Sequence, residues 1–276
     1  MQNQKNIDQT NAEILLAHAI SQEKEFIIAH PEYKLSLWEW VKFKYYIYKR
    51  KQNYPLAYIT GKKEFYGLDF NITEDVLVPR PETEQIVDLA LEQINEMDDH
   101  ILLADTGTGS GCIPISILKN LEKKKISQLE TIATDISDEA LEIAKKNSKK
   151  YKVEIDFRQG NLAEPIKSEL KSYENVVITA NLPYLTREEF NSEQSIQQEP
   201  KEALVAEEKG LELYENLLEQ IKNFSLKNQN LVLFFEINPW QKENIKKLVK
   251  QRLNNCKIDF KKDLNKKDRI LILRQS

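Results

Sequence analysis

The chain has few of the residues that build disulfide frameworks and metal centres. Only two of its 276 residues, Cys112 and Cys256, are cysteines, which excludes a disulfide scaffold and favours a reducing compartment. The three histidines, His18, His30 and His100, have no carboxylate or thiol companions at metal-ligand spacing. We therefore expect no metal site.

Long apolar runs and a strong charge of either sign are also lacking. Forty Lys and Arg nearly balance 44 Asp and Glu, which leaves a formal net charge of −4. Such a balance does not suggest a domain that binds nucleic acid chiefly by attraction to its phosphates. No apolar run approaches membrane-spanning length, and the polar amino terminus lacks the apolar core of a signal peptide. We expect a cytoplasmic protein with neither a membrane nor a direct nucleic-acid partner.

Glycine is scarce, and three of the seven glycines fall within five residues, Gly107-Thr108-Gly109-Ser110-Gly111. This run follows an expected strand ending in Asp105 and precedes an expected helix, so backbone can approach a ligand at the helix amino terminus. A tight strand-to-helix turn is the plainer alternative. The dinucleotide fingerprint requires glycine where Cys112 stands, which disfavours a nicotinamide or flavin cofactor.

Strands and helices alternate from residue 100 onward, which predicts an α/β fold with a parallel sheet and helices on both faces. Two short strands after residue 253 predict an antiparallel edge. Helices are expected near 113–122, 138–150, 211–224 and 240–253. The expected strands are Ile101–Asp105, Glu130–Thr134, Val153–Arg158, Asn175–Ala180, Leu231–Ile237 and Arg269–Leu273.

The first part of the chain has helical periodicity and many aromatic residues. Leu37, Val41, Tyr45 and Tyr48 fall on one helical stripe, and Leu15, Ala19 and Ile20 suggest an earlier helix. We favour a small helical core over a partner-docking face, although both can hold. Alternation around a Gly turn at 64–72 then predicts a hairpin, and the prolines of Val78–Glu84 stop any strand before a helix opens.

Polar groups follow the next strands at their carboxyl ends. Asp135 ends the second strand, where a carboxylate can accept hydrogen bonds from both hydroxyls of a ribose. Asn161 and Leu162 follow the third strand, where an adenine could rest against Leu162, although an ordinary loop role is equally consistent with them. Carboxyl ends of parallel strands share one edge, so we expect one nucleoside ligand there.

Asn181-Leu182-Pro183-Tyr184 follows the fourth strand and carries the most specific chemistry. Pro183 offers no N–H and fixes φ, so the neighbouring carbonyls are held rather than paired in the sheet. The side-chain oxygen of Asn181 and the carbonyl of Leu182 can accept both hydrogens of a planar NH2 group lying on Tyr184. The stretch predicts a clamp for an amide or an exocyclic amine.

These motifs together resemble the S-adenosylmethionine-dependent methyltransferases of the Rossmann-like class, and more closely the release factor glutamine methyltransferase family. The resemblance spans nearly the whole chain and includes the Pro79–Glu84 stretch, Pro-Arg-Pro-Glu-Thr-Glu, which is specific to the family. It implies a helical, release-factor-docking domain over 1–62, a β-hairpin linker over 63–78, and a methyltransferase domain over 79–276 with helices on both faces of its sheet.

The resemblance also implies an activity and a set of roles. Members methylate the side-chain amide nitrogen of the glutamine in the Gly-Gly-Gln loop of class-1 peptide release factors, which supports translation termination. S-adenosyl-L-methionine would be bound by Gly107 to Gly111, Asp135, Asn161, Leu162 and Asn181. Asn181 to Tyr184 would hold the substrate glutamine. Arg80 and Glu82 would border the pocket, unless Glu82 only opens a helix.

Three positions depart from the family pattern: Asn161 replaces an acid, Leu182 a proline, and Asn238 a glycine. The clamp uses the carbonyl of Leu182, so its side chain is not essential. Because Asn-Leu-Pro-Tyr is also the form in ribosomal RNA adenine dimethyltransferases, a ribosomal RNA or DNA adenine-N6 methyltransferase is the first alternative. A cofactor-binding but inactive scaffold is the second. We expect a monomer whose partner is a release factor.

Overall fold

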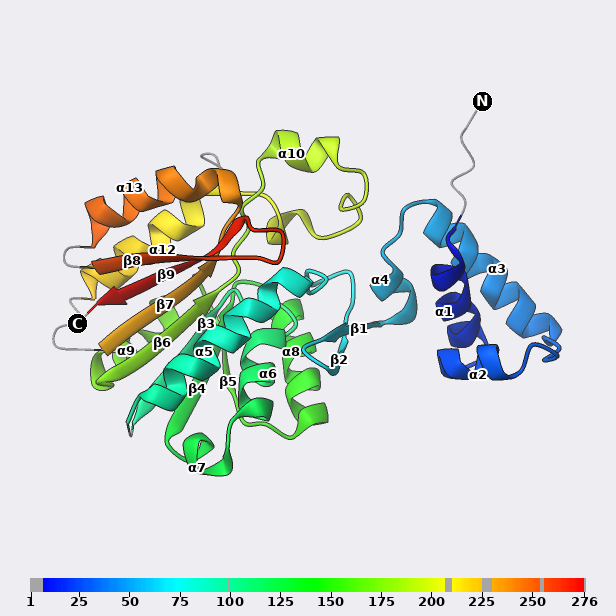
Figure 1. The fold of residues 1–276 in the computed structure, drawn as a ribbon, viewed down its shortest axis with the longest axis horizontal. Helices are drawn as coiled ribbons and strands as arrows, with labels where there is room; N and C mark the ends of the chain where they lie inside the picture. The colour runs from blue at the N-terminus through cyan, green and yellow to red at the C-terminus, as the bar shows by residue number, and fades with distance from the viewer. Residues whose placement is uncertain (1–6, 99, 207–209, 225–229, 254–255, 276) are drawn as a thin grey trace.

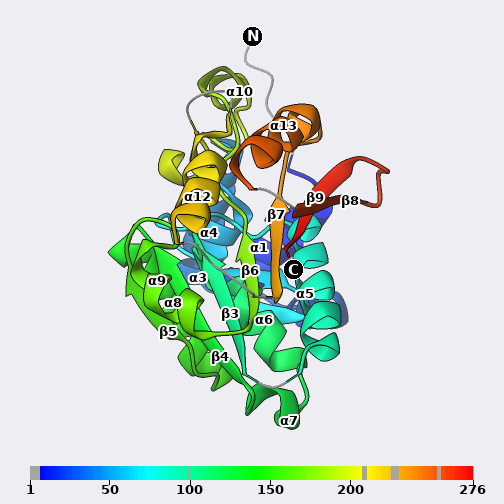
Figure 2. The same ribbon diagram turned by 90° about the vertical axis from the view of Figure 1, so that its left-hand side faces the viewer.

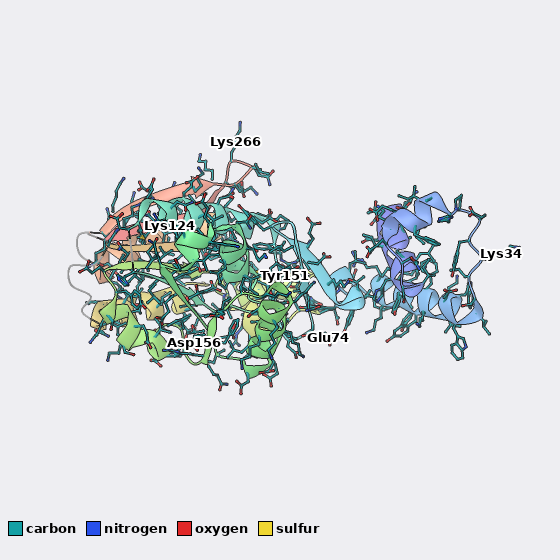
Figure 3. All side chains as sticks on the ribbon, turned by 90° about the horizontal axis from the view of Figure 1, so that it is seen from below. Lys34, Glu74, Lys124, Tyr151, Asp156 and Lys266 are labelled. Carbon is teal, nitrogen blue, oxygen red and sulfur yellow. The ribbon has the colours of Figure 1, made fainter. Side chains whose placement is uncertain are left out.

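The computed structural model describes residues 7–98, 100–206, 210–224, 230–253 and 256–275, which form two lobes joined by a hairpin (Figure 1). The smaller lobe contains the amino-terminal helices and lies to one side of the sheet. Side chains at its far end include Lys34, whereas Glu74 lies at the junction between the lobes (Figure 3). The elements of this part are α1 (Gln9–Ala19), α2 (Lys24–Ala29), α3 (Leu37–Lys51), α4 (Leu56–Thr60), β1 (Lys62–Phe65) and β2 (Leu68–Asn71).

The described part of the larger lobe contains a seven-stranded sheet with the order β5-β4-β3-β6-β7-β9-β8. Neighbours from β5 to β7 run parallel, and β9 runs antiparallel to both β7 and β8. The predicted parallel sheet and its antiparallel edge are therefore confirmed. The strands are β3 (Ile101–Thr106), β4 (Leu129–Asp135), β5 (Asp156–Gln159), β6 (Asn175–Ala180), β7 (Asn230–Glu236), β8 (Cys256–Lys262) and β9 (Asp268–Gln275).

Helices cover both faces of this sheet, as predicted. One face packs against α5, α6 and α8, and the other against α9, α12 and α13. Figure 2 shows α12 and α5 on opposite sides of the central strands. The helices are α5 (Glu84–Glu96), α6 (Cys112–Asn120), α7 (Lys123–Ile126), α8 (Asp138–Tyr151), α9 (Lys167–Ser172), α10 (Arg187–Ser192), α12 (Glu212–Asn223) and α13 (Lys242–Arg252). Short 3-10 turns are η1 (Pro81–Thr83), η2 (Glu164–Ile166), η3 (Lys201–Ala203) and η4 (Pro239–Gln241).

The strand order reverses at β3, which lies between β4 and β6. In open α/β sheets the crevice outside the carboxyl ends of the strands at such a reversal is where ligands bind. All six residues of β3 are buried, so the loop that follows starts from a rigid base. None of the described helices is both long and apolar enough to cross a membrane.

The strand expected at Val153–Arg158 begins later than predicted, at Asp156. Lys152 has φ 54° and ends α8 in the left-handed conformation. The N–H of Val153 then bonds to the carbonyl of Ser148 in the closing turn of that helix, so it is not available to the sheet. The alternating residues Val153, Glu154 and Ile155 therefore follow a helix end, and periodicity alone does not distinguish this from the start of a strand.

The helical stripe at Leu37, Val41, Tyr45 and Tyr48 does not form the core of the smaller lobe. All four side chains are exposed, Leu37 to 74%. Helix α3 forms because Ser36 and Glu39 make a capping box at its start, but it packs through a different face that leaves none of its residues fully buried. The core of this lobe comes instead from Leu15, Ala17, Ala19, Ile20, Ala57 and Ile59.

Candidate active site

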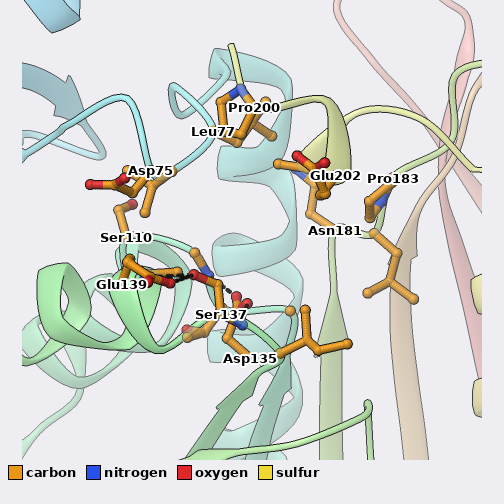
Figure 4. A pocket seen from close by; sticks show the side chains of 18 of the residues that line it. Asp75, Leu77, Ser110, Asp135, Ser137, Glu139, Asn181, Pro183, Pro200 and Glu202 are labelled. Carbon is orange, nitrogen blue, oxygen red and sulfur yellow. Dashed lines mark hydrogen bonds between the residues drawn. The ribbon is translucent and has the colours of Figure 1, made fainter.

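A cavity of about 460 Å³ lies at the carboxyl ends of the central strands. Its wall is made by the loops after β3, β4, β5 and β6, which are the four positions that the sequence predicted. Two further segments close it, Glu74–Pro79 after the hairpin and Pro200–Ala203 before α12. Figure 4 shows side chains from these segments facing one another across the space.

The glycine loop lies where β3 gives way to α6. Gly107 has φ +70°, and a Cβ there would lie 2.9 Å from Cδ2 of Leu182, so this position needs glycine for both its backbone and its close neighbour. Gly109, with φ +54°, has open space where a Cβ would lie. Gly111 is not part of the cavity wall. It is the N-cap residue of α6 and packs on Ile115 and Ala144.

Asp135 ends β4 and joins the loops on either side of it. Its Oδ2 accepts a hydrogen bond from the N–H of Gly109 at 2.8 Å, and its Oδ1 accepts one from Ser137 at 3.0 Å. Burial raises the pKa of Asp135 above its ordinary value, although these backbone donors oppose the shift. Each oxygen retains a lone pair, so the carboxylate can still accept from a diol in the cavity.

Asn161 and Leu162 both line the cavity, as predicted. Leu162 is buried and has φ 55°, and its carbonyl accepts a hydrogen bond of 2.7 Å from the hydroxyl of Thr134. Gln220 donates to the carbonyl of Asn161 at 3.3 Å. These bonds use the two backbone carbonyls and leave the Leu162 side chain as an apolar wall of the cavity.

Asn181 follows β6 and contributes an acceptor without a partner. Its Nδ2 donates to Oγ1 of Thr83 at 3.1 Å. Its Oδ1 is buried and has no hydrogen-bond partner among the described residues. An unpaired buried carbonyl oxygen costs about 1–3 kcal/mol, which a ligand N–H would relieve. Asn181 lines the cavity, so this unpaired acceptor belongs to a side chain beside the space where the predicted clamp would hold its substrate.

The rest of the Asn-Leu-Pro-Tyr turn lines the cavity only in part. Leu182 and Pro183 line the cavity, and the Leu182 side chain, 2% exposed, packs against the glycine loop. Tyr184 does not line it. Its hydroxyl donates to Oε1 of Glu236 at 3.3 Å, burial raises its pKa, and it packs as a partly buried side chain against the core. Its place under a substrate amide stays a prediction.

Arg80 and Glu82 do not line the cavity, whereas their neighbours Pro79 and Thr83 do, so the place of Arg80 and Glu82 at its border stays a prediction. The guanidinium of Arg80 pairs with Glu199 at 2.5 Å, and Glu199 also accepts from the N–H of Val78 at 3.2 Å. This buried carboxylate ties the Pro79 segment to the Pro200 segment. Glu82 is in η1, at the entry to α5, which agrees with its helix-opening role.

Several cavity residues were missed in the sequence. Ile136 lines the cavity with 71% of its surface exposed, and Glu202 lines it too (Figure 4). Asp135, the neighbour of Ile136, was recognised in the sequence, so adjacency was the available signal for Ile136. The described wall contains no Lys, Arg or His, but it contains five acids: Glu74, Asp75, Asp135, Glu139 and Glu202.

This lining fits a cationic nucleoside ligand. The acids favour positive charge and disfavour phosphate. Asp135 can accept from a ribose, and Ile136 and Leu162 provide apolar surface for a base. The residues present thus suit a sulfonium-bearing nucleoside, and the cavity volume is in the range of small-molecule sites.

Comparisons with known proteins give the same picture. Residues 2–61 match the family described as the PrmC N-terminal domain, and residues 103–195 match a methyltransferase domain family. A release factor glutamine methyltransferase of Mycoplasma mycoides is 36% identical over 98% of this chain and 94% of its own length. One of Bacillus anthracis is 32% identical over 96% of this chain and 92% of its own length.

Solved structures with low identity share the fold. The catalytic domain of hMettl16, in complex with a hairpin of the MAT2A 3'UTR, superposes with a TM-score of 0.58 at 16% identity over 76% of each chain. The human methyltransferase 10 domain containing protein gives 0.50 at 15% identity, covering 76% of this chain and 89% of that one. At such identities the likeness concerns only the α/β sheet and its helices.

Proposed function

This chain belongs to the family of release factor glutamine methyltransferases, and we propose that it methylates the side-chain amide nitrogen of the Gly-Gly-Gln glutamine in class-1 release factors. S-adenosyl-L-methionine is its methyl donor, as its methyltransferase domain implies. The proposal includes a monomer in the cytoplasm, where release factors act on ribosomes.

The donor occupies the cavity at the carboxyl ends of β3, β4 and β5. The loop from Gly107 to Ser110 lets backbone approach it, and Asp135 accepts its ribose hydroxyls. The Leu162 side chain, Asn161 and Ile136 would hold its adenine. Acidic side chains around the cavity balance the positive charge of the sulfonium. When bound, this donor supplies a methyl group on positively charged sulfur.

The residues of the Asn-Leu-Pro-Tyr turn prepare the nucleophile. An amide nitrogen is a weak nucleophile because its lone pair is delocalised into its carbonyl. Asn181 Oδ1 and the Leu182 carbonyl accept its two hydrogens, which places negative charge on nitrogen and fixes its direction. The unpaired, buried Oδ1 of Asn181 is the observation that carries this proposal. The described wall contains carboxylates but no histidine or lysine, and we assign none of these carboxylates as a strong base: the amide loses its proton to water after the methyl group has been transferred.

The Leu182 carbonyl remains available for this purpose. The hydroxyl of Tyr214 lies 3.3 Å from it, but the same hydroxyl is closer to the carbonyl of Glu236. One hydroxyl carries one hydrogen, which goes to the nearer acceptor. A substrate N–H can therefore bond to Leu182 without displacing a strong internal bond.

We assign release-factor docking to the smaller lobe, residues 1–62. Helix α3 presents an exposed apolar face that no other described segment covers, and six large apolar side chains form it. Exposed patches of this kind mark protein-binding surfaces, and aromatic anchors are enriched at their centres. The α3 apolar face consists of Leu37, Trp38, Trp40, Val41, Tyr45 and Tyr48.

Incubation with methyl-labelled donor and either a class-1 release factor or ribosomal RNA tests the proposal. We expect label only in the release factor, and mass spectrometry should place a single methyl on the loop glutamine. A release factor with that glutamine changed to alanine is the control and should stay unlabelled. Label in RNA adenine would instead support the nucleic-acid alternative, and donor binding without any transfer would support the inactive scaffold.

A further inference from the structure

A hydrogen-bonded chain leads from Glu236, which does not line the cavity, through Thr83 to Asn181, both of which do. Glu236 is the last residue of β7, and its Oε2 accepts a hydrogen bond from the Thr83 hydroxyl at 2.5 Å. Oγ1 of Thr83 in turn accepts from Nδ2 of Asn181 at 3.1 Å. Glu236 and Thr83 are 1% and 2% exposed, so water does not compete for these bonds. The three residues come from segments that lie far apart in the sequence.

The direction of this chain is fixed at its Glu236 end. When Glu236 is ionised, the state that the nearby Arg269 favours, its carboxylate only accepts hydrogen bonds, so the single hydrogen of the Thr83 hydroxyl points to Glu236. The oxygen of Thr83 can then only accept from Asn181. This forces the NH2 of Asn181 toward Thr83 and its carbonyl oxygen toward the cavity. Reversing the amide would set two acceptors against each other in a buried site.

Glu236 also holds the other end of the Asn-Leu-Pro-Tyr turn. Its Oε1 accepts from the hydroxyl of Tyr184 at 3.3 Å, and its main-chain carbonyl accepts from Tyr214. Arg269 lies close enough to favour the charged carboxylate, against the burial that raises its pKa. The Glu236 side chain thus bonds to Tyr184 directly and to Asn181 through Thr83, without itself lining the cavity.

We propose that Glu236 and Thr83 are positioning residues. Glu236 takes the only hydrogen of the Thr83 hydroxyl, so Thr83 can only accept from the NH2 of Asn181, and the carboxamide oxygen of Asn181 stays facing the substrate. The inference rests on the proposed function, because it concerns the same acceptor. It adds that Glu236, which does not line the cavity, sets the orientation of Asn181 through Thr83, and that loss of this orientation impairs methyl transfer without impairing donor binding. A hydroxyl is required at position 83, whereas bulk alone is insufficient.

Thr83→Val tests the requirement, because valine keeps the shape and removes the hydroxyl. We expect kcat on release factor to fall about 10- to 100-fold, as for a misdirected catalytic group, with the Kd for S-adenosylmethionine within about twofold of wild type. Thr83→Ser should restore most of the rate. Thr131→Val is the matched control, since its buried hydroxyl in β4 has no described partner and the rate should not change.

A double-mutant cycle separates positioning from a merely structural role. In an Asn181→Ala background, Thr83→Val and Glu236→Gln should lower the residual rate by less than about twofold, because the group they orient is gone. A full additive loss would overturn the inference, as would wild-type kcat in Thr83→Val. Donor binding measured by calorimetry reports whether each variant is folded. Failure of the proposed function itself would appear separately, as an unlabelled release factor with the wild-type protein.

Discussion

Gly107→Ala should destabilise the protein more than Gly109→Ala, although both glycines have positive φ. The left-handed backbone costs a residue with a Cβ about 1–2 kcal/mol, and this term is common to both changes. Only at Gly107 would the new Cβ meet another group, Cδ2 of Leu182 at 2.9 Å. Leu182 is 2% exposed and has little room to move, so overpacking adds about 1–3 kcal/mol.

Urea denaturation without S-adenosylmethionine measures this difference. The Gly107 variant should unfold at the lower urea concentration with an unchanged slope. Leu182→Ala removes the obstructing methyl, so in that background Gly107→Ala should cost no more than Gly109→Ala does in the wild type. If the two glycine variants lose equal stability, or if the cost of Gly107→Ala does not depend on Leu182, the contact with Cδ2 of Leu182 is not the cause of the loss.

Three further outcomes are expected. Burial raises the pKa of Asp105 from 3.8 to about 6, so the wild-type protein keeps the stability that the protonated form provides below about pH 4 and loses it as the pH rises through 6. Asp105→Asn does not titrate, so its free energy of unfolding in chemical denaturation should rise by about 3 kcal/mol relative to that of the wild type between pH 4 and pH 8. Burial raises the pKa of Cys112 to about 12, so a thiol reagent at pH 8 should leave it unmodified in the folded protein, as mass spectrometry would show. Trp38→Ala with Trp40→Ala should raise the KM for release factor about 5- to 10-fold and leave the Kd for S-adenosylmethionine unchanged, which steady-state kinetics and calorimetry can check.

The sequence predicted the cavity because its parts follow from local rules. A glycine run after a buried strand, an acid after the next strand and a polar turn after the fourth must meet at one edge of a parallel sheet. The positions of Gly107, Asp135, Leu162 and Asn181 in the cavity wall follow from that geometry. The antiparallel edge was equally local, since two short strands without an intervening helix can only pair as a hairpin.

What the sequence did not predict depends on contacts between distant segments. The ion pair of Arg80 joins it to Glu199, 119 residues away. Thr83 and Glu236 meet across 153 residues, and no spacing signals such a bond. The prediction that the apolar stripe of α3 belongs to a small helical core was wrong for a related reason. Periodicity shows that a helix has an apolar face, but not whether the rest of the protein covers that face. Trp38 belongs to that uncovered face.

The most direct test of the account is single-turnover methylation of a class-1 release factor by Asn181→Ala, with S-adenosylmethionine saturating. Removing the buried acceptor should slow methyl transfer by about 100-fold or more, as the loss of a positioned group does, while donor affinity measured by calorimetry changes little. Transfer at the wild-type rate would mean that the glutamine amide is held by something other than Asn181, and the proposed mechanism would be wrong.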